Sequence, residues 1–281
     1  MGFAIGSSKD QELAIGGVKV GGFAIGNVKV MSAPPMRRVL YPTDSENLYL
    51  HGIDNDARSD TRVSLWRIKF PEGSVTPLGD PGVNYSGSNI VNVSGTLFGM
   101  GTSLFKVDRT GLFLSSIGDP GIRGSVSYSE LAYHNNKLYS IAQVFSRNVA
   151  DRIDYLVEIN KTTGVATRVG SSVDFGISGF QSHFHPHIGG LQSHGGTLYM
   201  TALSSFYSLN TTTGVASQIG SSGLGRNRIH EELASFNNVL YTIDNDGQFG
   251  SINPTSGAFT RVGSLNYFGM NLRNIFGMFA L

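Results

Sequence analysis

Three histidines in alternate positions are the residues of this chain best suited to hold a metal ion. His183, His185 and His187 occur within the stretch "GFQSHFHPHIGGLQSHGG". In an extended segment alternate residues share one side, so the three imidazoles would face the same way. Neutral imidazole is the commonest metal ligand among side chains, and the pattern predicts a candidate metal site. Pro186 disturbs a regular strand and no carboxylate stands beside the cluster, which favours the alternative of a surface contact loop that includes Phe184.

Two copies of the phrase Ile-Asp-Asn-Asp offer carboxylates that could hold calcium. They place Asp54 and Asp56 in one copy and Asp244 and Asp246 in the other. A complete calcium loop needs further oxygen ligands and a terminal bidentate glutamate at a fixed spacing, and neither copy has them. Asp and Asn are also favoured turn residues, so we expect two plain turns and no cofactor other than the candidate histidine-bound metal.

Acid–base catalysis would need carboxylates and a cationic partner in one cleft. The candidates are Glu130, Glu231, Glu232, Arg226 and Arg228. The sequence has no Gly-x-Ser-x-Gly nucleophile elbow and no phosphate-binding loop. Its single tryptophan also offers little aromatic surface for stacking sugars. We therefore predict that the protein is not an enzyme, with a glycoside hydrolase as the weakest alternative.

The composition excludes several classes of protein and partner. The 281 residues include 37 glycines and no cysteine, and the net charge is +1. No disulfide framework or thiolate metal site can form, and a near-neutral chain gives no reason to expect nucleic acid as a partner. We expect no membrane insertion, because no window holds 18 apolar residues, and the N-terminus lacks the pattern of a signal peptide.

A long repeat covers most of the chain beyond residue 38. Each copy has a strand with a Leu-aromatic pair, a second apolar strand, a turn with glycine, and a closing strand that ends in glycine. A further strand precedes the pair in "SNIVNVS", "SELAYHN", "GGLQSHG" and "EELASFN". Units of about 40 to 50 residues with four strands are typical of β-propeller blades. The pairs are Leu48-Tyr49, Leu97-Phe98, Leu138-Tyr139, Leu198-Tyr199 and Leu240-Tyr241.

The repeat predicts an all-β propeller with five blades, and six blades remain an alternative. The final "NIFGMFAL" is similar to the inner part of a blade, so it begins a sixth blade or closes the ring. Adjacent apolar residues such as Leu65 and Trp66 indicate strands buried on both faces. His134 and His194 occupy one repeat position, which Val93 and Phe236 occupy in other copies, and we expect them to pack rather than to bind metal.

The first 31 residues contain a different repeat with a period of ten. "AIGGVKV" and "AIGNVKV" predict β-hairpins that turn at Gly16-Gly17 and Gly26-Asn27. Such short hairpins cannot bury a core alone and need a partner. We therefore divide the chain into a hairpin module at 1–31, a proline-containing linker at 32–38 and a propeller at 39–281.

The hairpin repeat resembles the short aromatic-aliphatic-Gly-x-x-Lys-Val repeat found near the ends of tail and fibre proteins of tailed bacteriophages. The residues that carry the resemblance are Ile15, Gly16, Lys19, Val20, Ile25, Gly26, Lys29 and Val30. The first copy, at 5–9, lacks the valine. The resemblance covers about a tenth of the chain and implies a non-enzymatic virion protein whose N-terminus docks to the tail.

This resemblance also implies partners and a location. Other phage tail proteins would bind the N-terminal module, and the propeller would contact a host-surface receptor, with a glycan as one option. We expect the protein to be made in the host cytoplasm and to be oligomeric in the virion tail. The alternative is a free-standing propeller that binds carbohydrate or protein, for which the module packs on its own ring.

Overall fold

A computed structural model shows two units, which contacts within the chain define as Met1–Arg37 and Arg38–Leu281. In the first unit the structure describes four short strands. In the second, the described residues are 46–53, 63–69, 74–79, 90–107, 114–121, 126–144, 153–170, 188–202, 204–221, 230–244, 246–264 and 275–280.

The first unit contains two β-hairpins with the same pairing. In one, β1 (Leu13–Ile15) pairs antiparallel with β2 (Val18–Val20), and Ile15 lies opposite Val18. In the other, β3 (Ala24–Ile25) pairs with β4 (Val28–Lys29), and Ile25 lies opposite Val28. Two residues separate the strands of each hairpin, as the repeat predicts. Each hairpin is a separate two-stranded sheet.

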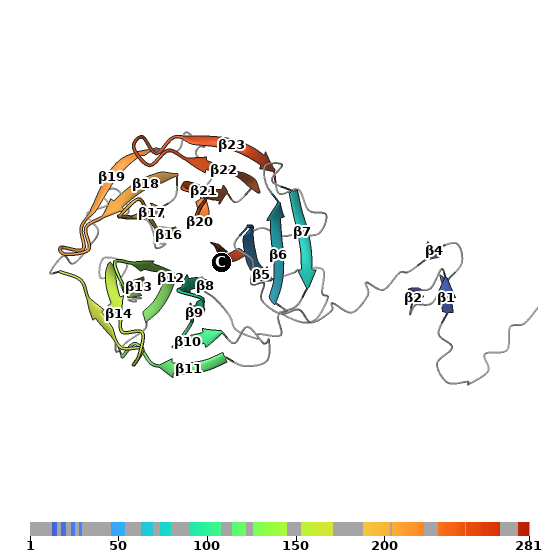
Figure 1. Ribbon diagram of the computed structural model, residues 1–281, viewed down its shortest axis with the longest axis horizontal. Coiled ribbons are helices and arrows are strands. Elements are labelled where there is room, and N and C mark those ends of the chain that lie inside the picture. Colours follow the sequence, from blue (N-terminus) through green and yellow to red (C-terminus); the bar gives the residue numbers. More distant parts are fainter. Residues whose placement is uncertain are drawn as a thin grey trace, which may run out of the picture. The chain divides into compact units, whose positions relative to one another are not determined.

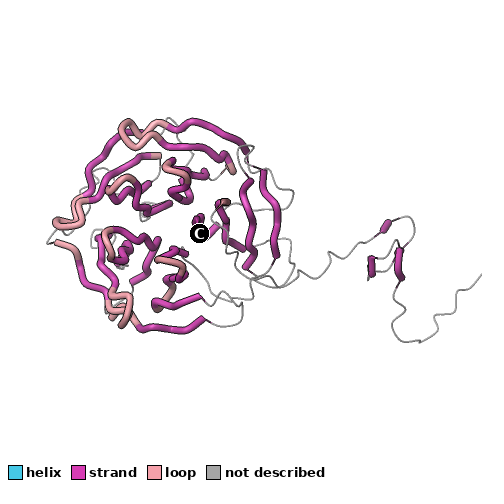
Figure 2. Tube along the Cα trace, in the orientation of Figure 1, coloured by secondary structure: helices cyan, strands magenta, loops and turns pink. Residues whose placement is uncertain are grey.

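The second unit is a five-bladed β-propeller, as the repeat predicts, with five four-stranded antiparallel sheets arranged around an axis (Figures 1 and 2). We number the blades I to V. Blade I is β24 (Ile275–Ala280), β5 (Leu48–Ile53), β6 (Val63–Lys69) and β7 (Ser74–Gly79). Blade II is β8 (Ile90–Val93), β9 (Thr96–Met100), β10 (Leu104–Val107) and β11 (Leu114–Gly118).

The other three blades each use four consecutive strands. Blade III is β12 (Val126–His134), β13 (Lys137–Val144), β14 (Ile153–Ile159) and β15 (Ala166–Arg168). Blade IV is β16 (Ile188–His194), β17 (Thr197–Ala202), β18 (Ser205–Leu209) and β19 (Ala216–Ser221). Blade V is β20 (His230–Phe236), β21 (Val239–Asp244), β22 (Gln248–Ile252) and β23 (Phe259–Ser264).

The last strand of the chain closes the ring. β24 is the innermost strand of blade I and pairs antiparallel with β5, with Met278 opposite Leu50 and Phe279 opposite Tyr49. The C-terminal end of the chain accordingly lies near the centre of the ring (Figure 1). The sequence left open a sixth blade or a closing strand for "NIFGMFAL", and the structure shows the closing strand.

Tight turns join the innermost strand to the second strand in blades II to V. Both central residues have positive φ, for example +47° and +68° at Asn135 and Asn136. That backbone is the type I′ turn, whose twist matches antiparallel strands, and Asn or Gly adopts it at the lowest steric cost. The other three pairs are Ser94-Gly95, Gly195-Gly196 and Asn237-Asn238.

Among the described residues the hydrophobic core of the ring forms five clusters, one at each contact between neighbouring blades. Blade III and blade IV, for example, share a cluster that includes Leu156 and Met200, both fully buried. Adjacent residues in one strand serve different clusters: Leu65 packs toward blade II and Trp66 toward blade V. This explains why the strands are apolar on both faces, since each face of a sheet meets another sheet.

Asn-x-x-x-Gly turns join the third and fourth strands in blades III to V. In blade IV, Asn210 Oδ1 accepts hydrogen bonds from the amides of Thr212 and Thr213 at 2.9 and 3.0 Å. The Gly214 amide then donates to the Asn210 carbonyl at 2.8 Å, with φ of +75° at the glycine. Asn160 and Asn253 make the same bonds in blades III and V.

Each of these turns also touches the closing glycine of the preceding blade. A Cβ built on Gly220 of blade IV would lie 2.1 Å from the carbonyl oxygen of Ser256 in the turn of blade V. Gly170 meets the carbonyl of Thr213 in the same way, also at 2.1 Å. Close backbone approach between blades therefore requires glycine at the ends of blades II, III and IV, at Gly118, Gly170 and Gly220.

Candidate functional site

The histidine cluster predicted as a metal site or contact loop lies outside the described residues. This applies to His183, Phe184, His185 and His187. Among the residues that the structure does describe, no group of three or more His, Cys, Asp or Glu side chains is placed to hold a metal ion.

The N-terminal docking residues lie in part within the described strands. Ile15, Lys19 and Val20 belong to the first hairpin, and Ile25 and Lys29 to the second. Ala14 pairs with Lys19 and Ala24 pairs with Lys29, so the two hairpins carry their lysines at equivalent register positions. Gly16, Gly26 and Val30 lie outside the described residues.

The second Asp-Asn-Asp phrase forms a turn, as the sequence predicts. Asp244 is fully buried, and its Oδ1 accepts hydrogen bonds from the amides of Asp246 at 3.0 Å and Gln248 at 2.7 Å. The Gly247 amide donates to the Asp244 carbonyl at 2.9 Å. The carboxylate thus organises the connection between β21 and β22. Asp54 and Asp56 lie outside the described residues.

The two repeat-position histidines pack between blades, as expected, and also form hydrogen bonds that the sequence did not predict. His134 Nδ1 of blade III lies 2.9 Å from Ser193 Oγ of blade IV. His194 Nδ1 of blade IV lies 2.9 Å from Ser235 Oγ of blade V. His134 is only 4% exposed, and burial lowers its pKa because it disfavours the charged imidazolium.

Two of the candidate acid–base residues lie at equivalent positions in innermost strands. Glu130 in β12 is 7% exposed and has a positive φ of +56°, and Glu232 in β20 is 2% exposed. A hydroxyl supports each backbone: Ser140 Oγ donates to the Glu130 carbonyl and Thr242 Oγ1 to the Glu232 carbonyl, both at 2.7 Å. Arg226 and Arg228 lie outside the described residues, as does the side chain of Glu231.

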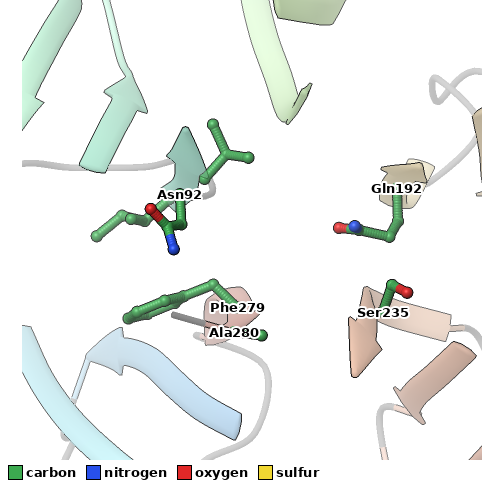
Figure 3. Close-up of a pocket in the computed structure, with 7 residues that line it drawn as sticks. Asn92, Gln192, Ser235, Phe279 and Ala280 are labelled. Atoms are coloured by element: carbon green, nitrogen blue, oxygen red, sulfur yellow. The ribbon is translucent and has the colours of Figure 1, made fainter. Parts of the chain in front are cut away.

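The centre of the ring contains a cavity of about 260 Å³. Innermost strands of four blades line it, and its polar groups come from Asn92 of β8, Gln192 of β16 and Ser235 of β20 (Figure 3). The other lining residues are Ile90, Val91, Phe279 and Ala280, of which the first three are at most 9% exposed. No carboxylate is among these lining residues, so they supply no acid–base pair.

Local hydrogen bonds fix the orientation of both amides in the cavity. The Gly95 amide donates to Asn92 Oδ1 at 2.9 Å. This bond turns the Asn92 NH₂ group away from the Gly95 amide. Gln192 Nε2 donates to the Ser193 carbonyl at 3.1 Å, which leaves the Gln192 Oε1 atom as an acceptor. In Figure 3 the Gln192 carbonyl oxygen points across the cavity, and the Asn92 nitrogen is turned toward Phe279.

Gln192 departs from the blade repeat. The register of the innermost strands places it opposite Tyr199, the position at which Val91 lies opposite Phe98 and Phe279 opposite Tyr49. Four of the five blades therefore have an apolar residue where blade IV has glutamine. Gln192 and Asn92 were not among the candidate site residues predicted from the sequence. The usable signal was this departure, since "GGLQSHG" aligns with "SELAYHN" and "EELASFN".

The cavity can therefore bind a small neutral molecule by hydrogen bonds to amide groups.

The described residues contain no helix that is long and apolar enough to cross a membrane.

Comparisons with known proteins give a fold likeness and no function. No family model matches the sequence, and no curated protein matches it. A solved structure from Bacteroides thetaiotaomicron, described as a structural genomics protein of unknown function, is similar with a TM-score of 0.48 and 16% sequence identity. The match covers 86% of this chain and 61% of that chain. This comparison does not link the chain to phage proteins.

Proposed function

We propose that this chain is a non-enzymatic attachment protein of a tailed-phage virion. Its N-terminal hairpins dock to a neighbouring tail protein, and its five-bladed propeller is displayed for contact with a host-surface receptor. The observation that carries the proposal is the pair of two-stranded hairpins with the same register, 10 residues apart, in a unit that contacts define separately from the ring.

The size of the hairpins supports docking. Their strands are two or three residues long, and within the described residues each sheet has only two strands. A two-stranded sheet is marginally stable in water, and its outer edges offer backbone donors and acceptors to a further strand. Addition of a partner strand would satisfy those groups and is a common mode of recognition.

The register of the hairpins supports a repeated contact. Ile15 pairs with Val18 and Ile25 pairs with Val28, whereas the neighbouring pairs join alanine to lysine. The two hairpins thus repeat one order of an aliphatic pair beside an alanine–lysine pair. A partner that buries the apolar groups of both hairpins would gain about 25 cal/mol per Å² of apolar surface removed from water.

The test is incorporation of variant chains into virion tails. Deletion of residues 1–31, or the double change Ile15→Asp and Ile25→Asp, is expected to abolish incorporation while the melting temperature of the ring stays unchanged. The matched control is Ile15→Val with Ile25→Val, which keeps an aliphatic side chain at both positions. Cryo-EM of the particle is expected to show the hairpins buried against another tail polypeptide. Full incorporation of the deleted chain would refute the docking role.

A free-standing binding propeller is the second candidate, and the polar cavity in the ring favours it. In that case the chain would be a monomer, and the hairpins would pack on the chain's own ring. Limited proteolysis of the purified chain separates the two candidates: cleavage confined to residues 1–31 supports docking to another protein, and protection of those residues supports the free-standing protein.

A further inference from the structure

We infer that the central cavity of the ring binds one neutral, hydroxyl-rich ring, such as a single pyranose unit of a glycan. The inference deepens the proposed function, because it gives the displayed propeller a ligand class and a site. It rests on the proposed function only for its biological setting, since the binding itself can be measured on the purified full chain.

The free hydrogen-bonding groups of the cavity match a hydroxyl-bearing ligand. Asn92 uses Oδ1 to accept from the Gly95 amide, and its NH₂ group makes no hydrogen bond within the described part of the chain. Gln192 uses its NH₂ group toward the Ser193 carbonyl, and its Oε1 likewise has no partner among the described residues. The cavity thus offers donors from one blade and an acceptor from another. A hydroxyl group donates and accepts, so a molecule with several hydroxyls can satisfy both amides.

The third polar group already has a defined partner. Ser235 Oγ lies 2.9 Å from His194 Nδ1, which holds the hydroxyl in place at the edge of the cavity. A hydroxyl keeps additional hydrogen-bonding capacity after one contact, because it has one donor and two acceptor lone pairs. Ser235 can therefore bind the ligand without leaving the histidine.

The absence of charge in the lining restricts the ligand further. All seven lining residues are uncharged, so an ionic ligand would lose hydration and find no opposite charge in the lining. Ile90, Val91 and Phe279 are only 1%, 9% and 3% exposed, so the cavity offers a mainly polar surface that suits a ligand rich in hydroxyl groups. Phe279 is held in position by Tyr49, with ring centroids 5.8 Å apart and Tyr49 fully buried.

The volume of the cavity limits the ligand to one ring. At 260 Å³ it is just below the range of roughly 300–1,000 Å³ that is typical of pockets for drug-sized ligands.

Gln192 is the least expected residue in the cavity, because packing alone would favour the apolar side chain that the other four blades have at this position. A ligand that needs an acceptor explains why blade IV differs.

The test is titration calorimetry and ligand-observed NMR on the full chain. The probes are methyl α-glucoside, methyl α-galactoside, methyl α-mannoside and N-acetylglucosamine, with glucuronate as a charged comparison. At least one neutral probe is expected to bind saturably at one site per chain, more tightly than glucuronate. Gln192→Ala is expected to weaken that binding about two- to tenfold, the typical effect of one neutral hydrogen bond.

The variants are chosen so that the fold is kept. Alanine is the residue at the equivalent positions 132 and 234, so the ring accommodates Gln192→Ala. Asn92→Asp keeps the acceptor for the Gly95 amide, removes the NH₂ donors and is expected to weaken binding to a similar extent. Gln218→Ala is the matched control, because Gln218 is an exposed glutamine of the outer strand β19.

Three outcomes overturn the inference: no neutral probe binds saturably, glucuronate binds more tightly than every neutral probe, or Gln192→Ala and Asn92→Asp bind as the Gln218→Ala control does. Tail incorporation of the Gln192→Ala chain is expected to stay unchanged. A failure of sugar binding therefore refutes the cavity ligand alone, whereas a failure of hairpin-dependent incorporation refutes the docking role.

Discussion

The contact between a closing glycine and the turn of the next blade predicts a large effect of a single methyl group. Gly220→Ala would place Cβ 2.1 Å from the Ser256 carbonyl oxygen, whereas real Cβ contacts essentially never fall below 3.0 Å. The obstacle is backbone on both sides, so blades IV and V would have to move apart. Overpacking of this kind costs typically 1–3 kcal/mol, and we expect about 2 kcal/mol for this variant.

Three further glycines separate the steric contribution from backbone strain. Gly196→Ala tests strain alone, because its φ is +79° and nothing lies within 4 Å of the added carbon, and its expected cost is about 1–2 kcal/mol. Gly170→Ala combines a φ of +67° with a contact at 2.1 Å, so its cost should approach the sum of the other two. Gly101→Ala is the control, because its nearest contact is an ordinary 3.9 Å.

The assay is thermal unfolding of the four purified variants at one pH. For domains near the size of the ring, 1 kcal/mol lowers the melting temperature by about 2–4 °C. We therefore expect a decrease of about 4–8 °C for Gly220→Ala, a larger decrease for Gly170→Ala and almost none for Gly101→Ala. Equal melting temperatures for the variants at Gly220 and Gly101 would refute the argument that close approach holds neighbouring blades together.

Three other predictions concern ring closure, a buried histidine and a turn. Met278→Asp puts a charge at a position in the closing strand that is only 1% exposed, and we expect this charge to open the ring. The opening would be measured as earlier elution in size-exclusion chromatography and a lower melting temperature. Unchanged elution and melting temperature would contradict closure of the ring by this strand. Burial lowers the pKa of His134, so the unfolded chain binds the proton first and stability falls as pH drops below 6.5. His134→Phe introduces the residue found at the equivalent position 236, and this variant should lose less stability than the native chain between pH 7 and 5. An equal loss in both proteins would show that His134 is not responsible for the pH dependence of stability. Asn210→Ala removes two hydrogen bonds to turn amides and should cost about 1 kcal/mol, whereas Thr212→Ala should be near neutral in the same melts.

The blade architecture was predictable because it repeats. The Leu-aromatic pairs and the apolar residues on both strand faces mark every blade locally, and the Asn-x-x-x-Gly turns mark blades III to V. The role of residues 275–281 was not decided, because β24 resembles any innermost strand in sequence. Only its partner distinguishes a closing strand from a sixth blade, and that partner, β5, is remote in the chain.

The cavity could not be predicted from residue types alone. The site residues predicted from the sequence were mainly histidines and carboxylates, whereas the cavity is lined by two neutral amides, a hydroxyl and apolar residues. Asn92, Gln192 and Phe279 are far apart in sequence and meet only because the ring brings innermost strands to one axis. The hydrogen bonds from His134 and His194 were missed for the same reason, since their serine partners belong to the next blade.

Ring closure also determines how the propeller responds to mechanical tension. The first described strand of the ring, β5, has β24 on one side and β6 on the other, with five and six paired positions. A pull on the N-terminal segment therefore acts on an inner strand, and both ladders must shear before that strand leaves the blade. An edge strand in the same position would be held by one ladder and would peel away at lower force. A propeller tethered by its N-terminus is thus attached at a mechanically resistant strand.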